Sequence, residues 1–521
     1  MACAVVGCAG VSEPVVQGET RTRAAFINPS EGLLNRKVLA AALVVAATSL
    51  LAVGSAFIAP ATAAAPDTTY LVLAPSGNST AKAAARVAAA GGTVVASYGQ
   101  IGVLVARSTN PDFASAAAGQ GVEAVASTTG LGSLLEEEET LGTVESDVQQ
   151  ATGNPAAEPL FGLQWNMTQI DVPEAHAVTT GSPDVVVGVL DSGISSTHPD
   201  LVTQIAKDKS ASCLGGVVDT TEAAWNPTTS DHGTHVAGIV AGALNGVGVT
   251  GVAPGVKVAS LKVVTDAGFI FPEAAVCGFM WVAEHGMQVT NNSYFIDPWE
   301  LNCRNDARQR PVWLAVQRAI RYAQSKGVLT VASSGNSNYD LQHKFVDAGS
   351  PNDGSSPVET RDVNGACLVL PGEAPGVVTV SAVGTQRLKS YYSSYGQGVV
   401  DVTGPGGDTR QPNPAVSTIA NAVLSATFNT VTKVNGWGYK QGTSMSGPHA
   451  AGVAALALSA HPGLRPAALA AFLERTAEPL PCPAGIYNPR PGLDEWLAER
   501  TGGTRNGFYG AGEVNAFNAV K

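Results

Sequence analysis

The sequence predicts an α/β protein in which a mainly parallel sheet is packed between helices, preceded by a small α+β unit. Two observations support the main part. From about residue 160 to the end, short apolar strands alternate with helical segments, which is typical of parallel α/β sheets. The 58 glycines indicate many tight turns rather than a helical bundle. The clearest strands are expected at residues 185–190, 258–263, 288–290, 328–332 and 377–383.

A separate pattern precedes this region, from about residue 68 to residue 125. Two helices are expected, at residues 80–90 and 113–120. Four strands are expected around them, at residues 70–73, 93–95, 101–106 and 122–125. The order β-α-β-β-α-β is that of a ferredoxin-like unit. On this pattern alone, the unit fits any small binding domain.

Length and charge narrow the class of protein. The 521 residues suffice for a large core with accessory segments, and 45% of them are apolar. The net charge of −12 argues against a nucleic-acid partner, because phosphate binding needs clustered Lys and Arg.

The N-terminal part carries an export pattern. An apolar run at residues 38–58 follows Asn35-Arg36-Lys37 and precedes the small-x-small sequence Ala61-Thr62-Ala63. We expect residues 1–63 to hold an N-terminal extension and a signal peptide, cleaved after Ala63 or Ala65, so that the protein is secreted. The run is also about long enough to span a bilayer. The alternative is therefore a membrane-anchored protein facing outside, although the cleavage pattern favours removal.

Cysteine usage fits an exported protein. Cys3 and Cys8 precede the signal and leave with it, and five others remain: Cys213, Cys277, Cys303, Cys367 and Cys482. In an oxidising compartment, four of the five can form two disulfides, with three possible pairings. The absence of a C-x-x-C spacing argues against a structural zinc site.

Three short motifs lie in the α/β region. In VVVGVLDSGI an apolar strand ends in Asp191, which places the carboxylate at the sheet edge where open α/β folds bind ligands. In DHGTHVAG, His232 precedes a small-residue stretch that suits a buried helix. In QGTSMSGPHAAGVAALAL, Ser444 stands at the entry to an apolar helix, where Pro448 is tolerated in the first turn.

Together these residues have the chemistry of an activated serine. A serine hydroxyl needs a neutral imidazole to take its proton and a carboxylate to hold the imidazole tautomer. The backbone N–H of Ser444 can donate to the oxyanion. Asn336, in VLTVASSGNS after another strand, is the candidate second donor through its amide. We therefore predict Asp191, His232 and Ser444 as catalytic residues.

These motifs and their order, with the segments GVAPGVKVASLKV, VTNNS, SSGN and APGVVTVSAVG, resemble the subtilisin-like (S8) serine peptidases over residues 160–521. The resemblance implies a three-layer α/β/α domain and a serine endopeptidase that works through an acyl-enzyme on proteins or peptides. It implies no cofactor for the chemistry.

The resemblance also assigns further residues position by position. Asn336 matches the oxyanion asparagine, and Ser293 matches the start of the strand that binds the substrate backbone. Gly268 lies near the opposing substrate strand. Tyr294 and Phe295 stand where the family commonly has Leu and Gly, so broad specificity is not assumed. The far wall of the S1 pocket is matched by Ala332, Ser333, Ser334 and Gly335.

The resemblance extends upstream as well. Residues 66–128 resemble the I9-type inhibitory propeptide, which chaperones folding and is then cleaved off. Residues 129–159, with the acidic run Glu136–Glu139, read as an exposed linker that includes the maturation region. The loop LNGVGVTGVAP is one residue shorter than the usual calcium loop and lacks its side-chain ligands. Asp200 keeps one carboxylate there, so structural calcium stays an open alternative.

Two other functions remain to be weighed. One is a proteolytically silent binding protein of the same fold, against which the complete set of catalytic residues argues. The other is a membrane-anchored processing protease with a narrow substrate, in which residues 38–58 are retained. A peptide-cleavage assay separates the first from a protease, and the N-terminus of secreted protein separates the second.

Overall fold

The computed structural model describes residues 67–77, 79–128, 133–134, 140–147, 153–296, 299–344, 346–350, 359–410, 418–483, 485–488 and 505–521. The chain divides into two compact units, residues 1–62 and 63–521. The first unit, and with it the predicted extension, signal, Cys3 and Cys8, lies outside the described residues, as do the predicted cleavage positions and the acidic run.

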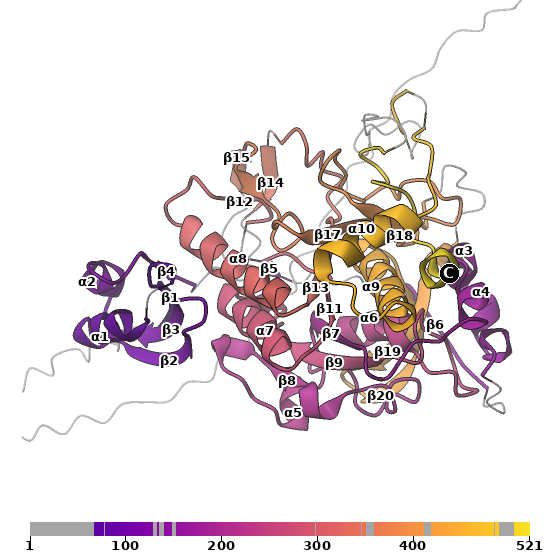
Figure 1. Cartoon of the computed structure of the whole chain (residues 1–521), viewed down its shortest axis with the longest axis horizontal. Coiled ribbons are helices and arrows are strands. Elements are labelled where there is room, and N and C mark those ends of the chain that lie inside the picture. The colour runs from indigo at the N-terminus through magenta and orange to yellow at the C-terminus, as the bar shows by residue number, and fades with distance from the viewer. Residues whose placement is uncertain are drawn as a thin grey trace, which may run out of the picture. The chain divides into compact units, whose positions relative to one another are not determined.

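A seven-stranded sheet forms the centre of the second unit (Figure 1). All neighbouring strands in it are parallel. The five strands expected from the sequence are present, so the predicted parallel α/β sheet is confirmed. In spatial order the strands are β18 (Val402–Pro405), β17 (Val377–Val383), β13 (Leu329–Ser333), β11 (Val289–Asn292), β7 (Val186–Asp191), β9 (Lys257–Lys262) and β8 (Ala211–Ser212).

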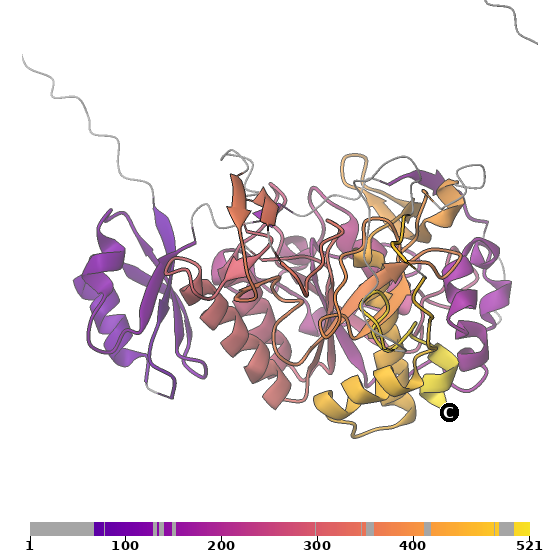
Figure 2. The ribbon, with the colours of Figure 1, turned by 90° about the horizontal axis from the view of Figure 1, so that it is seen from above.

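Helices cover both faces of this sheet (Figures 1 and 2). On β7, Val187 and Val189 pack in one apolar cluster with helices α6 (His232–Ala241) and α9 (Thr443–Ala460). The alternate residues Val186 and Leu190 pack with α7 (Pro272–Glu284) and α8 (Arg310–Ser325). Since both faces are covered, central strands such as β7 and β17 are buried along their whole length. The three-layer α/β/α architecture is thereby confirmed.

The helices differ in sequence according to how deeply they are buried. Along α8, the buried side chains recur every three or four residues, as on a helix with one face in the core: Val312, Ala315, Val316, Ala319, Ile320 and Ala323. Helix α9 is buried from Thr443 to Leu458 and is built mainly of small residues. At Gly452, a Cβ atom would lie 2.7 Å from Val252, so the close approach of the helix to this neighbour requires glycine.

The small unit has the predicted element order. Its antiparallel sheet runs β2-β3-β1-β4, with both helices on one face. The elements are β1 (Thr68–Leu73), α1 (Ala81–Ala89), β2 (Thr93–Tyr98), β3 (Val103–Ser108), α2 (Phe113–Ala117) and β4 (Ala124–Ser127).

Several short elements were not expected from the sequence. Strand β5 (Ser133–Leu134) pairs antiparallel with β10 (Phe269–Ile270). Strand β6 (Gly142–Val144) joins the hairpin of β19 (Val423–Asn429) and β20 (Val434–Lys440) as a third strand. The remaining strands are β12 (Asn302–Cys303), β14 (Val346–Ser350), β15 (Glu359–Asp362) and β16 (Cys367–Leu368). The remaining α-helices are α3 (Trp165–Gln169), α4 (Val172–His176), α5 (Glu222–Trp225), α10 (Pro466–Thr476) and α11 (Ala516–Val520).

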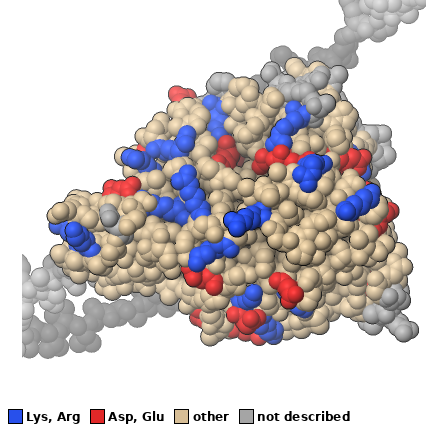
Figure 3. All heavy atoms as spheres, in the orientation of Figure 1, with Lys and Arg blue, Asp and Glu red and all other residues tan. Residues whose placement is uncertain are grey.

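The surface agrees with the composition. On the face drawn in Figure 3, uncharged residues dominate, and Lys and Arg are interspersed with Asp and Glu. Within the part of the chain that the structure describes, no helix is both long and apolar enough to cross a membrane.

Candidate active site

Asp191 and His232 meet at the carboxyl edge of the sheet. Asp191 is the last residue of β7, and His232 is the first of α6. The imidazole Nδ1 lies 2.9 Å from Asp191 Oδ1 and 3.0 Å from Oδ2, with both side chains almost wholly buried. At Gly233, a Cβ atom would lie 3.0 Å from that of Asp191, so glycine lets the helix start against the carboxylate.

Ser444 lies in the first turn of α9, where backbone N–H groups have no acceptor within the helix. It is 7% exposed. Its Oγ donates to the carbonyl of Ser293 at 3.5 Å, and the hydroxyl of Ser293 donates to the carbonyl of Ser444 at 2.9 Å. Thus the segment that follows β11 is tied to the start of α9.

Asn336 is held in one orientation by the residue before the serine. The N–H of Thr443 donates to Asn336 Oδ1 at 2.9 Å, and its hydroxyl donates to the same atom at 2.8 Å. The Thr443 hydroxyl also accepts from the N–H of Gly335 at 3.2 Å. These bonds to the amide oxygen fix the orientation of the Asn336 side chain, whose NH₂ is its donor end.

Asn336 and Ser444 line one cleft. Its other lining residues come from five separate segments: Ile270, Ser293, Tyr294, Phe295, Ser333, Gly335, Val369 and Thr443. His232 lines a second hollow, together with Thr140, Asp231, Phe428 and Lys440, among others. The structure therefore places Asn336 and Ser444 in one hollow and His232 in another.

The predicted substrate-binding residues are divided between the cleft and the core. Ser293, Tyr294, Phe295, Ser333 and Gly335 line the cleft. Ala332 is fully buried, and Ser334 is buried with its hydroxyl donating to Ser394 O. Gly268 has a positive φ of 85° at the turn before β10, whose Ile270 is the residue that reaches the cleft.

Tyr294 is turned inward rather than across the cleft. Its hydroxyl donates to Asn292 Oδ1 at 3.0 Å, and only 6% of the side chain is exposed. Burial, and then the charge of Asp191, raises the pKa of Tyr294, so it stays a neutral donor. Phe295 packs against the apolar cluster around Cys303 and Cys367.

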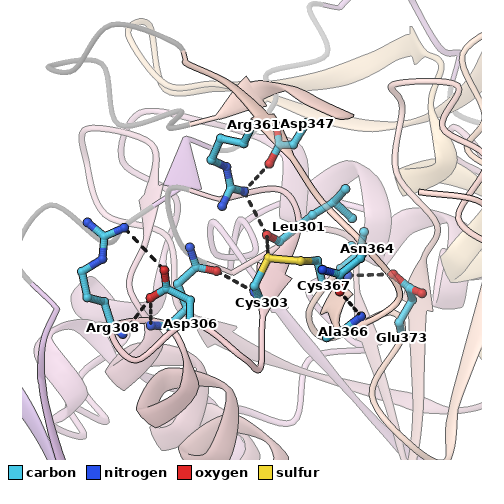
Figure 4. The surroundings of a disulfide bond; sticks show 12 residues. Leu301, Cys303, Asp306, Arg308, Asp347, Arg361, Asn364, Ala366, Cys367 and Glu373 are labelled. Carbon is cyan, nitrogen blue, oxygen red and sulfur yellow. Dashed lines mark hydrogen bonds and ion pairs between the residues drawn. A yellow bond between two sulfur atoms is a disulfide. The ribbon is translucent and has the colours of Figure 1, made fainter. Parts of the chain in front are cut away.

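Two disulfides settle the pairing that the sequence left open: Cys213–Cys277 and Cys303–Cys367. Figure 4 shows the second, which joins β12 to β16. Val369 follows directly after β16, and its N–H donates to Glu373 Oε2 at 2.8 Å. This bridge therefore ties down the segment that supplies Val369 to the cleft.

Asp200 does not fit a calcium site. Its Oδ2 accepts from Trp437 Nε1 at 2.7 Å and from the N–H of Val249 at 3.1 Å. At Gly248, a Cβ atom would lie 2.1 Å from Trp437 Nε1, so the indole fills the space beside the loop. The carboxylate is surrounded by N–H donors, whereas Ca²⁺ requires six to eight oxygen ligands. No cluster of three acidic, His or Cys side chains suited to a metal occurs among the described residues.

Sequence reasoning missed several residues of these hollows. Ile270, Val369, Thr140 and Lys440 come from elements that no local motif marks. Thr443 was signalled only by its place beside Ser444. The ion pair of Lys440 Nζ with Asp231 Oδ1, at 3.1 Å, links β20 to the start of α6 and had no sequence signal.

Comparisons with known proteins show the family of the chain. The sequence model of the subtilase family matches residues 182–512. Fervidolysin from Fervidobacterium pennivorans is 27% identical over 339 residues, which are 63% of this chain and 42% of that protein. M-protease from Shouchella clausii is 28% identical over 390 residues, covering 74% of this chain and 76% of that protein.

A solved structure shows the same fold. The crystal structure of the epidermin leader peptide processing serine protease from Staphylococcus aureus superimposes with a TM-score of 0.63 at 19% identity, covering 87% of this chain and 98% of that one. The family match extends over more than half of the chain and includes Asp191, His232, Asn336 and Ser444. The chain belongs to the subtilase family, as a serine endopeptidase that acts on proteins or peptides and whose chemistry needs no cofactor.

Proposed function

We propose that this chain is a secreted serine endopeptidase that cuts peptide bonds with Asp191, His232 and Ser444. The observation that carries the proposal is the contact of His232 Nδ1 with both carboxylate oxygens of the buried Asp191. A carboxylate at this nitrogen keeps the proton on Nδ1, which makes Nε2 the basic nitrogen, and it stabilises the imidazolium that forms during reaction.

The first half-reaction acylates the serine. Ser444 Oγ attacks the carbonyl carbon of the scissile bond while His232 Nε2 takes its proton. The negative charge then moves to the former carbonyl oxygen. When this tetrahedral intermediate collapses, the C–N bond breaks, and the imidazolium gives its proton to the leaving amine. An ester between Ser444 and the N-terminal half of the substrate remains.

The second half-reaction returns the enzyme. His232 takes a proton from water, the resulting nucleophile attacks the ester carbonyl, and Ser444 Oγ leaves with a proton from His232. In both halves, the oxyanion is stabilised by the N–H of Ser444 and the amide NH₂ of Asn336. The two hydrogen bonds from Thr443 to Asn336 Oδ1 support this role, because they orient the amide NH₂ of Asn336 before substrate binds.

The substrate backbone would lie between two segments of the cleft. The chain of Ser293, Tyr294 and Phe295 forms one side, and β10 offers an edge on the other. That β10 already accepts another strand, β5, supports a role in binding extended peptides. Ser333 and Gly335, with Val369 opposite, would enclose the side chain that precedes the scissile bond.

Replacing Ser444 with alanine tests the chemistry. We expect Ser444→Ala to lose peptidase activity by about 10⁴-fold or more, because no other group supplies the nucleophile. Phenylmethylsulfonyl fluoride should inactivate the mature enzyme. The matched control is Ser446→Ala, which removes a hydroxyl that donates to Thr443 O in the same helix. Full activity in Ser444→Ala would overturn the proposal.

We also propose that residues 66–128 act as an intramolecular inhibitor and folding chaperone. Supporting contacts involve the sheet face opposite the helices of the small unit. Leu71, Leu73 and Val105 share one buried apolar cluster with Phe279 of α7 and Ile320 of α8. Arg318 on α8 pairs with Glu123 at 2.6 Å.

The maturation cut would fall after Leu134 and before Thr140. Strand β5 pairs with the edge strand β10, which borders the cleft. Thr140 lines the hollow beside His232, and β6 follows it on β20. Pairing on both sides supports a cut between these two points.

N-terminal sequencing of the extracellular protein tests both the cut and export. We expect the mature chain to begin between residues 135 and 140. A start upstream of Ala63 on membrane-bound protein would instead favour the anchored form. A start far downstream of residue 147 would contradict the proposed cut, because β6 would then be lost from the enzyme.

A further inference from the structure

Lys389 is a fully buried lysine, with 0% of its surface exposed. Lysine is seldom buried completely unless an opposite charge accompanies it. Among the described residues, no carboxylate forms an ion pair with its ammonium group. Asp408 is the acidic side chain that acts on it, through a longer-range charge interaction. Such a residue is costly to retain for packing alone.

The amine of Lys389 forms a hydrogen bond to the turn that contains Asn338. Its Nζ donates to Asn338 Oδ1 at 2.6 Å and to the carbonyl of Ser390 at 3.2 Å. Two aromatic rings also lie near the amine, since Nζ is 5.1 Å from the ring centroid of Tyr395 and 5.9 Å from that of Phe508. Burial lowers the pKa of Lys389 to about 7, and the amine is a hydrogen-bond donor in either protonation state.

Asn338 adopts a conformation that needs support. Its φ of 53° lies in the left-handed region, which few non-glycine residues adopt without a local hydrogen bond. Its N–H donates to Tyr392 O at 2.8 Å, and its side-chain oxygen accepts from Lys389. Both bonds come from the segment 389–395, which therefore fixes the turn.

This turn follows Asn336 after a single intervening residue. Ahead of Asn336, Ser394 N–H donates to Gly335 O at 2.9 Å. Beyond the turn, Tyr339 N–H donates to Ser394 Oγ at 3.2 Å. Asn336 thus lies on a short loop that is hydrogen-bonded on both sides to the segment that carries Lys389. Thr443 donates to its amide oxygen.

We propose that Lys389 is a positioning residue for the reaction: by holding the turn at Asn338, it fixes the backbone that places the Asn336 amide in the cleft. The proposal rests on the oxyanion role of Asn336 proposed above. Lys389 does not touch substrate. It acts because a donor that stabilises the transition state must keep its place to within a fraction of an ångström.

A double-mutant cycle tests this. The variants are Lys389→Met, Asn336→Ala and their combination in the full-length protein, matured as usual, with kcat and KM measured on a peptide p-nitroanilide that the wild type cleaves. We expect Lys389→Met to lower kcat by about tenfold with little change in KM, since only transition-state binding is affected. In the Asn336→Ala background, the same change should lower kcat by less than about twofold.

Asn338→Gly provides a second route if Lys389→Met does not fold. Glycine adopts the positive φ readily but removes the oxygen that Lys389 holds. We expect the same loss of kcat and the same lack of effect in the Asn336→Ala background. Lys344→Met is the matched control, because it removes another buried amine, paired with Glu373 Oε1 instead. Lys344→Met should lower the thermal unfolding temperature. Asn336→Ala should lower kcat by the same factor with and without Lys344→Met.

Each failure has its own signature. If Asn336→Ala leaves kcat unchanged, the proposed oxyanion role is wrong. The inference about Lys389 is overturned by either of two results when Asn336→Ala does lower kcat. In the first, Lys389→Met and Asn338→Gly have no effect on kcat. In the second, they lower kcat by the same factor in the wild type and in the Asn336→Ala variant.

Discussion

At the scale of single residues, Asp200 shows how burial and hydrogen bonding compete over one carboxyl group. Its donors favour the charged form, but burial is the larger effect and raises its pKa to about 7. In the unfolded chain an Asp titrates near 3.9. The folded state therefore holds the proton to higher pH. The resulting contribution to stability is complete below about pH 4 and is lost as the pH rises through 7.

Asp200→Asn should remove this pH dependence. In the inactive Ser444→Ala background, which prevents self-digestion, the free energy of unfolding in urea is measured from pH 4 to 8 with and without Asp200→Asn. We expect the wild-type side chain to lose stability relative to Asn as the pH rises, by up to about 4 kcal/mol. Parallel pH profiles for the two proteins would contradict the burial argument.

The same carboxylate predicts the response to calcium. Because Trp437 and Val249 occupy it with N–H donors, we expect neither excess calcium nor a chelator to shift the unfolding temperature through this loop. Terbium luminescence sensitised by tryptophan gives a direct readout, since a lanthanide at Asp200 would adjoin the Trp437 indole. A calcium-dependent rise in unfolding temperature that Asp200→Asn abolishes would show that the site binds the ion after all.

At the scale of elements, the two disulfides form a natural comparison. Each closes a loop between cysteines 64 residues apart, so loop entropy predicts the same stabilisation for both, about 4 kcal/mol. Only Cys303–Cys367 adjoins the strand that leads into Val369 of the cleft. The two disulfides should therefore contribute equally to stability, whereas only Cys303–Cys367 should affect substrate binding.

Replacing each pair with serine makes this testable. We expect both double variants to unfold at lower temperature by similar amounts. Only Cys303→Ser/Cys367→Ser should also raise KM, because the wall that carries Val369 loses its tether. Cys213→Ser/Cys277→Ser serves as the control, since it removes an equal loop far from Val369 in sequence. Equal KM values for the two variants would contradict the role of the second bridge.

At the scale of the whole molecule, the small unit should inhibit through its contact with α8. Glu123 pairs with Arg318 where the side chains are partly exposed, so the pair is worth a modest amount. We expect Glu123→Arg, in separately produced residues 66–134, to weaken inhibition of the mature enzyme several-fold. Arg318→Glu in the enzyme should restore it. Asp112→Arg, an equal charge change at the start of α2, is the control, and equal weakening by both would argue against a specific contact.

What the sequence could predict depended on local pattern. Apolar strands and the residues at their ends, such as Asp191, follow from periodicity, and His232 and Ser444 follow from the start of small-residue helices. Contacts between residues that are far apart in the sequence leave no local pattern from which they could be predicted. Trp437 meets Asp200 across 237 positions, and Val369 lines the cleft just after a disulfide whose pairing was one of three. These contacts arise from tertiary packing, which no window of sequence contains.

Strand β6 has a practical consequence for anyone who produces this protein. With the cut before Thr140, the mature chain starts beside His232 and is immediately fixed to β20. An affinity tag fused at that new end would project into the hollow beside His232 and, with the proposed role of His232, compete with incoming peptides. The other end is better suited, because Lys521 is exposed after α11 and offers a handle that leaves the entrance clear.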